Sequence, residues 1–97
     1  MPRVIYSPAA IRDLQRLRDF LQDKNPTAAQ RAGEAIRSGV TLLGAQPGIG
    51  RLVEDLPDGF REWIIDFGDS GYVVRYHLGE DEVTILAIRH QREAGYS

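Results

Sequence analysis

The chain has 97 residues, of which 42% are hydrophobic and 27% charged, with 12 basic and 14 acidic side chains and a net charge of −2. This length predicts one globular domain over residues 1–97, and the acidic balance argues against a protein that grips a phosphate backbone over a broad surface. The absence of cysteine excludes disulfides and thiolate chemistry, and the lack of a long apolar run predicts a cytoplasmic protein without a membrane segment.

The first half of the sequence predicts a short strand at residues 4–6 followed by a helical hairpin. Each helix begins with a capping residue and a proline, at Ser7–Pro8 and Asn25–Pro26, with little room between the two helices. The polar residues Asp13 and Asp19 fall largely outside the apolar face of the first helix. The apolar positions are Ile11, Leu14, Leu17, Phe20 and Leu21 in the first helix and Ala29, Ala32, Ile36, Val40 and Leu43 in the second.

Three strands are predicted in the second half, separated by short glycine-containing turns. Residues 60–67 and 72–78 alternate between two faces, and residues 83–90 form a third, more apolar run. The connections at residues 68–71 and 79–82 are short enough for hairpins, which makes the three strands an antiparallel meander. The predicted fold is therefore α+β, in the order β–α–α–β–β–β, with an N-terminal strand and a helical hairpin packed on an antiparallel sheet.

No motif in the sequence predicts a metal site, a phosphate-binding loop or a nucleophilic centre. His77 and His90 are the two histidines, and neither has a second ligand at a recognisable spacing. We therefore expect no metal and no cofactor.

A basic cluster, "RHQREAGY" from Arg89 to Tyr96, follows the last predicted strand. It is compatible with a catalytic site, an RNA-binding site, or merely the solvated end of a strand. Arg75, in the middle strand, either reaches an open sheet face or forms a cross-strand ion pair with an acid such as Glu62. Tyr96 is either a terminal aromatic that covers the sheet or a functional residue, acting as a general base or a stacking platform. Because the first and third strands of a meander run parallel, Arg61 is not expected to meet His90.

Several landmarks in order resemble the RelE/ParE superfamily of toxins from bacterial toxin–antitoxin systems. They are "SPAAIRDL" at the first helix, "NPTAA" at the second, "PGIGR" before the sheet, "GYVVRY" in the middle strand and "VTILAIRHQR" in the last. The resemblance covers nearly the whole chain, and it implies the same fold that the pattern predicts. It also implies two possible activities: RelE-like members cut messenger RNA on the ribosome, whereas ParE-like members block DNA gyrase.

Matched to the RelE-like site, this chain keeps only part of the basic set. Arg61 stands where the first lysine lies, but Trp63 replaces the second, and Val73 replaces an arginine. A ribonuclease would have to use Arg61, His90, Arg92 and Tyr96. Because each lost transition-state stabiliser usually costs about 10²–10³ in rate, the resemblance to ParE is the better fit and no catalytic residue is favoured.

The ParE-like resemblance implies a toxin that inhibits DNA gyrase by binding it, without direct DNA binding by the toxin alone. The expected target-binding residues are Arg75, Arg89, His90, Arg92 and Tyr96. It also implies a hetero-oligomer with a ParD-like antitoxin, for which Leu14, Leu17 and Leu21 are the expected contacts. Two alternatives stay open: a RelE-like ribonuclease, and a non-toxic family member that only binds an antitoxin.

Overall fold

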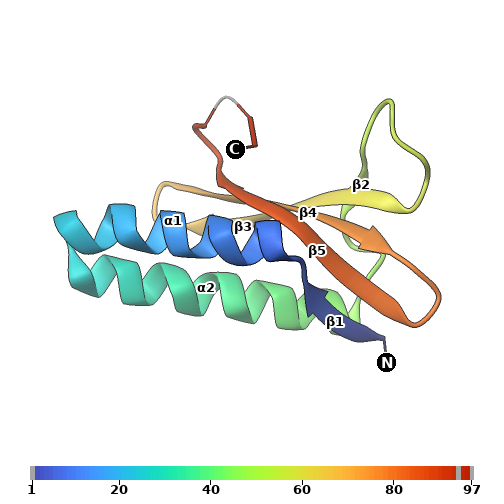
Figure 1. The fold of residues 1–97 in the computed structure, drawn as a ribbon, viewed down its shortest axis with the longest axis horizontal. Coiled ribbons are helices and arrows are strands. Elements are labelled where there is room, and N and C mark those ends of the chain that lie inside the picture. The colour runs from blue at the N-terminus through green and yellow to red at the C-terminus, as the bar shows by residue number, and fades with distance from the viewer. Residues whose placement is uncertain (1, 94, 97) are drawn as a thin grey trace.

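In the computed structural model, which describes residues 2–93, 95 and 96, a helical hairpin covers one face of a five-stranded sheet (Figure 1). The sheet order is β1-β5-β4-β3-β2. The strands are β1 (Arg3–Tyr6), β2 (Arg51–Leu52), β3 (Phe60–Phe67), β4 (Ser70–Leu78) and β5 (Glu82–His90), and the helices are α1 (Pro8–Lys24) and α2 (Pro26–Ala45). The predicted α+β class and element order are thereby confirmed.

The sheet is mixed rather than wholly antiparallel. The predicted meander exists: β3 pairs antiparallel to β4, and β4 antiparallel to β5. Strand β1, however, joins the outer side of β5 in parallel, with Val4 opposite Val83. The two-residue strand β2, which the sequence pattern did not predict, extends the other edge by pairing with β3.

The two helices meet at a single residue, Asn25. Its backbone N–H donates to the Leu21 carbonyl at 2.7 Å and so ends α1, while its side chain accepts from the Ala28 amide at 3.2 Å and so caps α2. At the start of α1, the Ser7 hydroxyl accepts from the Ala10 amide at 3.1 Å. Both predicted helix starts are confirmed, and the cap–proline pairs account for them.

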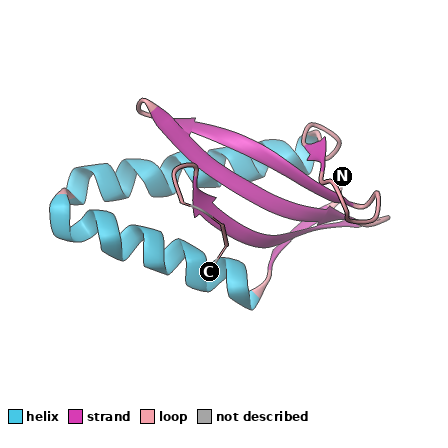
Figure 2. Cartoon of the chain, turned by 90° about the horizontal axis from the view of Figure 1, so that it is seen from above, coloured by secondary structure: helices cyan, strands magenta, loops and turns pink. Residues whose placement is uncertain are grey.

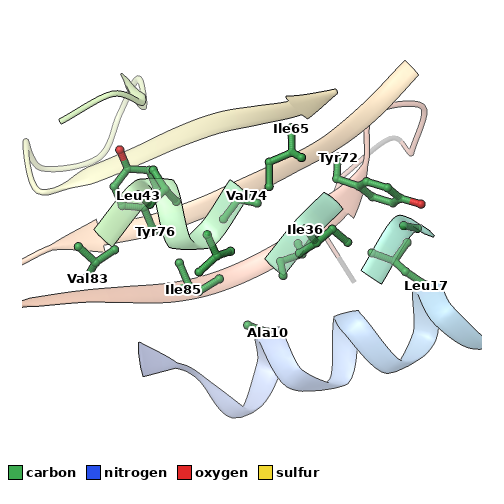
Figure 3. Close-up of a cluster of buried hydrophobic side chains, with 13 residues drawn as sticks. Ala10, Leu17, Ile36, Leu43, Ile65, Tyr72, Val74, Tyr76, Val83 and Ile85 are labelled. Carbon is green, nitrogen blue, oxygen red and sulfur yellow. The ribbon is translucent and has the colours of Figure 1, made fainter. Parts of the chain in front are cut away.

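The hydrophobic core lies between the hairpin and the sheet, as the sticks in Figure 3 show. The predicted apolar face of α2 is buried throughout, and it meets alternate residues of β3, β4 and β5. Gly39 of α2 lies so close to Ile65 that a Cβ atom there would come within 2.5 Å of its Cδ1. The core cluster comprises Ala10, Leu17, Ala32, Ile36, Val40, Leu43, Ile65, Tyr72, Val74, Tyr76, Val83, Ile85 and Ile88.

The short strand β1 covers only the first part of the outer edge of β5. Beyond it, side chains form the hydrogen bonds to the backbone of β5 that a neighbouring strand would otherwise form. The Ser7 hydroxyl donates to the Leu86 carbonyl at 3.1 Å, and the Ile88 amide donates to Asp13 Oδ2 at 2.9 Å. Glu93 accepts from the His90 amide at 2.8 Å. Asp13 is thus buried, contrary to its predicted place outside the apolar face, because it satisfies a backbone donor that no strand reaches.

Within the described part of the chain, no helix covers the other face of the sheet. Figures 1 and 2 show the chain after β5 turning back on this side of the strands, and Glu93 in that segment contacts Arg16 of α1. Among the described residues, no helix is long and apolar enough to cross a membrane.

Candidate functional site

Four side chains form a polar cluster on the helix-free face of the sheet. Tyr72, Val74 and Tyr76 of β4 point into the core, so the alternating side chains of that strand, Arg75 among them, point to the opposite face. The cluster consists of Glu62, Arg75, Arg89 and Tyr96, and we call it the tyrosine–arginine cluster.

Glu62 lies at the centre of this cluster. It stands opposite Arg75 in the β3–β4 pairing and opposite Arg51 in the β2–β3 pairing. Its Oε2 accepts a hydrogen bond from Arg75 Nε at 3.0 Å and another from the Tyr96 hydroxyl at 2.7 Å. Two ion pairs add to these: Arg75 Nη2 is 2.9 Å from Oε2, and Arg51 Nη2 is 3.8 Å from Oε1. The cross-strand ion pair between Glu62 and Arg75, one of the two arrangements considered from the sequence, is therefore present.

The contacts of Glu62 stabilise its charged form. Desolvation is the largest influence and acts to raise the pKa of this carboxyl group. Hydrogen bonds from Tyr96 and Arg75, together with the charges of Arg75 and Arg51, outweigh it, so that the pKa of Glu62 lies below its ordinary value. A carboxylate therefore persists at the centre of an otherwise basic surface at neutral pH.

The ring of Tyr96 lies close to two guanidinium groups. The Arg75 Cζ is 4.6 Å and the Arg89 Cζ 5.3 Å from the centre of its ring, both within the range of cation–π attraction. Burial first, and then the hydrogen bond to Glu62 and its charge, raise the pKa of the Tyr96 hydroxyl well above its ordinary value. The phenol therefore acts as a hydrogen-bond donor and an aromatic surface.

Arg89 folds the C-terminal segment against the end of β5. Its Nη1 donates to the Glu93 carbonyl at 2.9 Å and makes longer contacts of 3.4 Å with the carbonyls of His90 and Gln91. Glu93 in turn accepts from Arg16 Nη1 of α1 at 2.8 Å. These bonds help to bring Tyr96 back over the sheet, which was one of the two possibilities considered for it from the sequence.

His90 and Arg92 are not part of the tyrosine–arginine cluster. His90 follows Arg89 in the strand and therefore points to the opposite face, where its Nε2 is 2.9 Å from Ser70 Oγ and its ring meets Tyr72 edge-on. Arg92 is largely exposed, with its Nη2 3.7 Å from Asp69. The five predicted target-binding residues are thus divided between two surfaces.

Arg61 lies at the other end of the sheet, as its place in the meander predicts. It stands opposite Tyr76, whereas His90 stands opposite Tyr72. Arg61 Nη1 donates to the Gly50 carbonyl at 2.7 Å and to the Gly48 carbonyl at 3.3 Å, so it holds the loop before β2.

A cavity of about 730 Å³ opens between α1, the turn that joins β3 to β4, and the end of β5 with the residues that follow it. It includes Leu17 and Leu21, the largely exposed Phe20, and both His90 and Arg92. Leu17 is 93% buried and belongs to the core, so it presents little surface, while Leu21 is partly buried. Leu14 lines a smaller groove between α1 and α2, of about 240 Å³.

Two residues important for the site had weak signals in the sequence. Glu62 was considered only as a possible partner of Arg75, and Glu93 only as one charge in the C-terminal cluster. The sequence analysis considered the ion pair of Glu62 with Arg75, but it did not consider the hydrogen bond from Tyr96 to Glu62. No group of three or more histidine, aspartate or glutamate side chains suited to a metal ion occurs within the described part of the chain.

Known proteins resemble this chain over nearly its whole length. The model of the ParE toxin of type II toxin–antitoxin systems, parDE, matches residues 4–95. Toxin RelE3 of Caulobacter vibrioides is 38% identical over 93 residues, which cover 96% of this chain and 98% of the relative. Toxin RelE1 of the same organism is 37% identical over 90 residues, covering 93% of this chain and 94% of the relative.

A solved structure shares the fold. It is described as a chromosomal ParDE toxin–antitoxin system from P. aeruginosa, with a TM-score of 0.74 and 25% identity, covering 93% of this chain and 96% of that chain. The family match and this complex support an antitoxin as the partner. With two helices on a mixed sheet and a family model that spans all but its ends, the chain belongs to the ParE toxin family and is a toxin of a type II toxin–antitoxin system.

Proposed function

We propose that this toxin inhibits DNA gyrase by binding to it and has no enzymatic activity of its own. One observation carries the proposal: the hydroxyl of Tyr96 is committed as a donor to the Glu62 carboxylate, while Arg61 and His90 lie elsewhere. The set of groups that ribonuclease chemistry would require therefore does not converge on one point.

The protonation of Tyr96 argues in the same direction. A general base works best when its pKa lies near the operating pH, so that a useful fraction is deprotonated. Burial and the neighbouring Glu62 instead raise the pKa of Tyr96 above that of a free phenol. A tyrosine in this state is a weaker candidate for a general base at neutral pH than a free phenol.

The chemistry of the tyrosine–arginine cluster suits a protein partner. Aromatic and arginine side chains are enriched at protein interfaces, and a guanidinium group can bind an acidic side chain through two parallel hydrogen bonds. Ile64, which is 38% exposed on the same face, would add apolar contact. We propose Arg75, Arg89 and Tyr96 as the first surface for gyrase, with His90 and Arg92 as a second.

For the antitoxin, we propose a ParD-like protein that binds along α1 and forms a hetero-oligomer with the toxin in the cytoplasm. Phe20 is 63% exposed beside the 730 Å³ cavity, and Leu21 lines that cavity. Leu14 and Leu17 line the neighbouring groove between the helices. The expected mode of contact is an amphipathic helix of the antitoxin whose apolar side chains enter the cavity and the neighbouring groove along α1.

The test is a supercoiling assay with purified gyrase, run beside a cleavage assay on translating ribosomes with the same toxin preparation. We expect loss of supercoiling or trapped cleaved DNA, restored by the antitoxin, and intact messenger RNA. Undisturbed gyrase together with codon-specific cuts in messenger RNA would refute the proposal.

The second candidate is a RelE-like ribonuclease, and the names of the two Caulobacter relatives favour it. It predicts that Arg61→Ala, His90→Ala and Tyr96→Phe each abolish toxicity while the protein stays folded. Equal toxicity of all three variants would eliminate it.

Expression without any growth defect, in a host lacking the antitoxin, would instead indicate a non-toxic family member.

A further inference from the structure

A row of charged side chains crosses the helix-free face, with a carboxylate between two arginines. The pairing sets Arg51 of β2 beside Glu62 of β3, and Glu62 beside Arg75 of β4. Glu62 is 91% buried, whereas the Arg51 side chain is 72% exposed and that of Arg75 31% exposed. The negative charge is therefore fixed beneath the basic groups that reach the solvent.

Without that carboxylate the same surface would suit a nucleic acid. Arginines that contact phosphate and an aromatic ring on which a base stacks are the usual elements of single-strand binding sites. Arg51, Arg75, Arg89 and Tyr96 supply both elements. Glu62, however, accepts one hydrogen bond from Arg75 and one from Tyr96 and forms an ion pair with Arg75, and its charge repels a phosphate that approaches Arg75.

We propose that Glu62 is the residue that determines the specificity of this surface. It positions Tyr96 and Arg75 for a protein partner, and it excludes the phosphate backbone of RNA or DNA. The inference rests on the proposed function for the identity of the protein partner, while the exclusion of phosphate can be tested without gyrase.

Substitution of Glu62 by glutamine separates these roles because it keeps the shape and a hydrogen-bond acceptor but removes the charge. The matched control is Glu82→Gln, which removes the same charge from another strand carboxylate paired with an arginine, Arg3, at the far edge of the sheet. Both variants raise the net charge by one, so a difference between them reports the location of the charge.

Binding of a fluorescent oligouridylate to purified toxin is measured by anisotropy between about 50 and 200 mM salt. We expect Glu62→Gln to bind about tenfold more tightly than Glu82→Gln at the lowest salt. Release of Arg75 should add one phosphate contact. The plot of the logarithm of the binding constant against the logarithm of the salt concentration should then become steeper by about 0.7. Equal affinities and equal slopes of the two variants would overturn the proposal.

Gyrase inhibition by the same two variants tests the positioning role. We expect Glu62→Gln to inhibit about tenfold less well than Glu82→Gln, since Tyr96 and Arg75 lose their charged anchor. If wild-type toxin leaves gyrase active while Glu62→Gln gains affinity for the oligouridylate, the proposed target is wrong and the exclusion of phosphate stands. If wild type inhibits gyrase and the two variants behave alike in both assays, the role of Glu62 is wrong and the proposed function stands.

A third measurement applies even if Glu62→Gln does not fold, as judged by circular dichroism. The difference between the alkaline absorbance titrations of wild type and Tyr96→Phe isolates the ionisation of Tyr96. We expect it to occur above the range of a free phenol, whose pKa is about 10. Ionisation of Tyr96 near pH 10 would mean that its contact with Glu62 does not form in solution, and the proposal would fail.

Discussion

Replacement of Asp13 by alanine should destabilise this toxin more than any exposed substitution on the same helix. Asp13 is 95% buried, and its Oδ2 accepts the amide of the fully buried Ile88 at 2.9 Å. An unpaired buried N–H group costs about 1–3 kcal/mol. The contact with Arg16, at 3.7 Å and partly exposed, adds at most a few tenths of a kcal/mol.

We therefore expect Asp13→Ala to lower the free energy of unfolding by about 2 kcal/mol, or the Tm by roughly 10 °C for a domain of this size. Asp19→Ala, on the exposed face of α1, is the matched control. Like Asp13→Ala, it replaces an aspartate of the helix by the better helix former alanine, but it removes no hydrogen bond to a buried amide. Asp13→Asn, which keeps an oxygen acceptor for Ile88, should lie between the two. Urea unfolding of the three variants provides the comparison, and a difference of less than about 0.5 kcal/mol between Asp13→Ala and Asp19→Ala would refute the reasoning.

Three further predictions follow from other contacts. Tyr76→Phe should cost about 1–3 kcal/mol in urea unfolding, because the Tyr76 hydroxyl donates to the Pro47 carbonyl and accepts from the Gly50 amide; an unchanged midpoint would contradict this. Phe20→Ser should weaken antitoxin binding in calorimetry by about tenfold with little change in Tm, since Phe20 is 63% exposed; unchanged affinity would remove Phe20 from the interface. The pKa of Glu62 is lowered in the folded state, so its contribution to stability is present above its unfolded pKa of about 4.3 and is lost as the pH falls through the lower folded value. The difference in the free energy of unfolding between wild type and Glu62→Gln, measured in urea, should therefore be larger at neutral pH than at about pH 3. A difference that does not change with pH would contradict this.

Local patterns predicted the helices and the three long strands because their causes are local. The cap–proline pairs start both helices, and the apolar repeat of α2 matches its buried face. The edges of the sheet were not predictable in the same way. The parallel pairing of β1 with β5 joins residues about 80 positions apart in the chain, and β2 is a two-residue strand that depends on the loop held by Arg61.

The candidate site shows a similar limit. The adjacent residues Arg89 and His90 looked like one cluster in the sequence, but adjacent residues in a strand point to opposite faces. The alternation rule could have separated these two from the sequence alone. A terminal aromatic that covers the sheet was one of the two possibilities considered for Tyr96, but its bond to Glu62 was not, because that bond joins residues 34 positions apart and the segment is held in part by Arg16 of α1.

The single residue between the helices has a consequence for how this protein can vary. Asn25 ends α1 and begins α2, so the hairpin has no spare residue in its connection. One inserted residue there would turn α2 by about 100° about its own axis, unless a loop absorbed it, and would rotate Ile36 and Val40 away from the sheet. Over the course of evolution, changes in length should therefore collect in the connection between β2 and β3 and at the C-terminus, while the junction of the helices keeps its length.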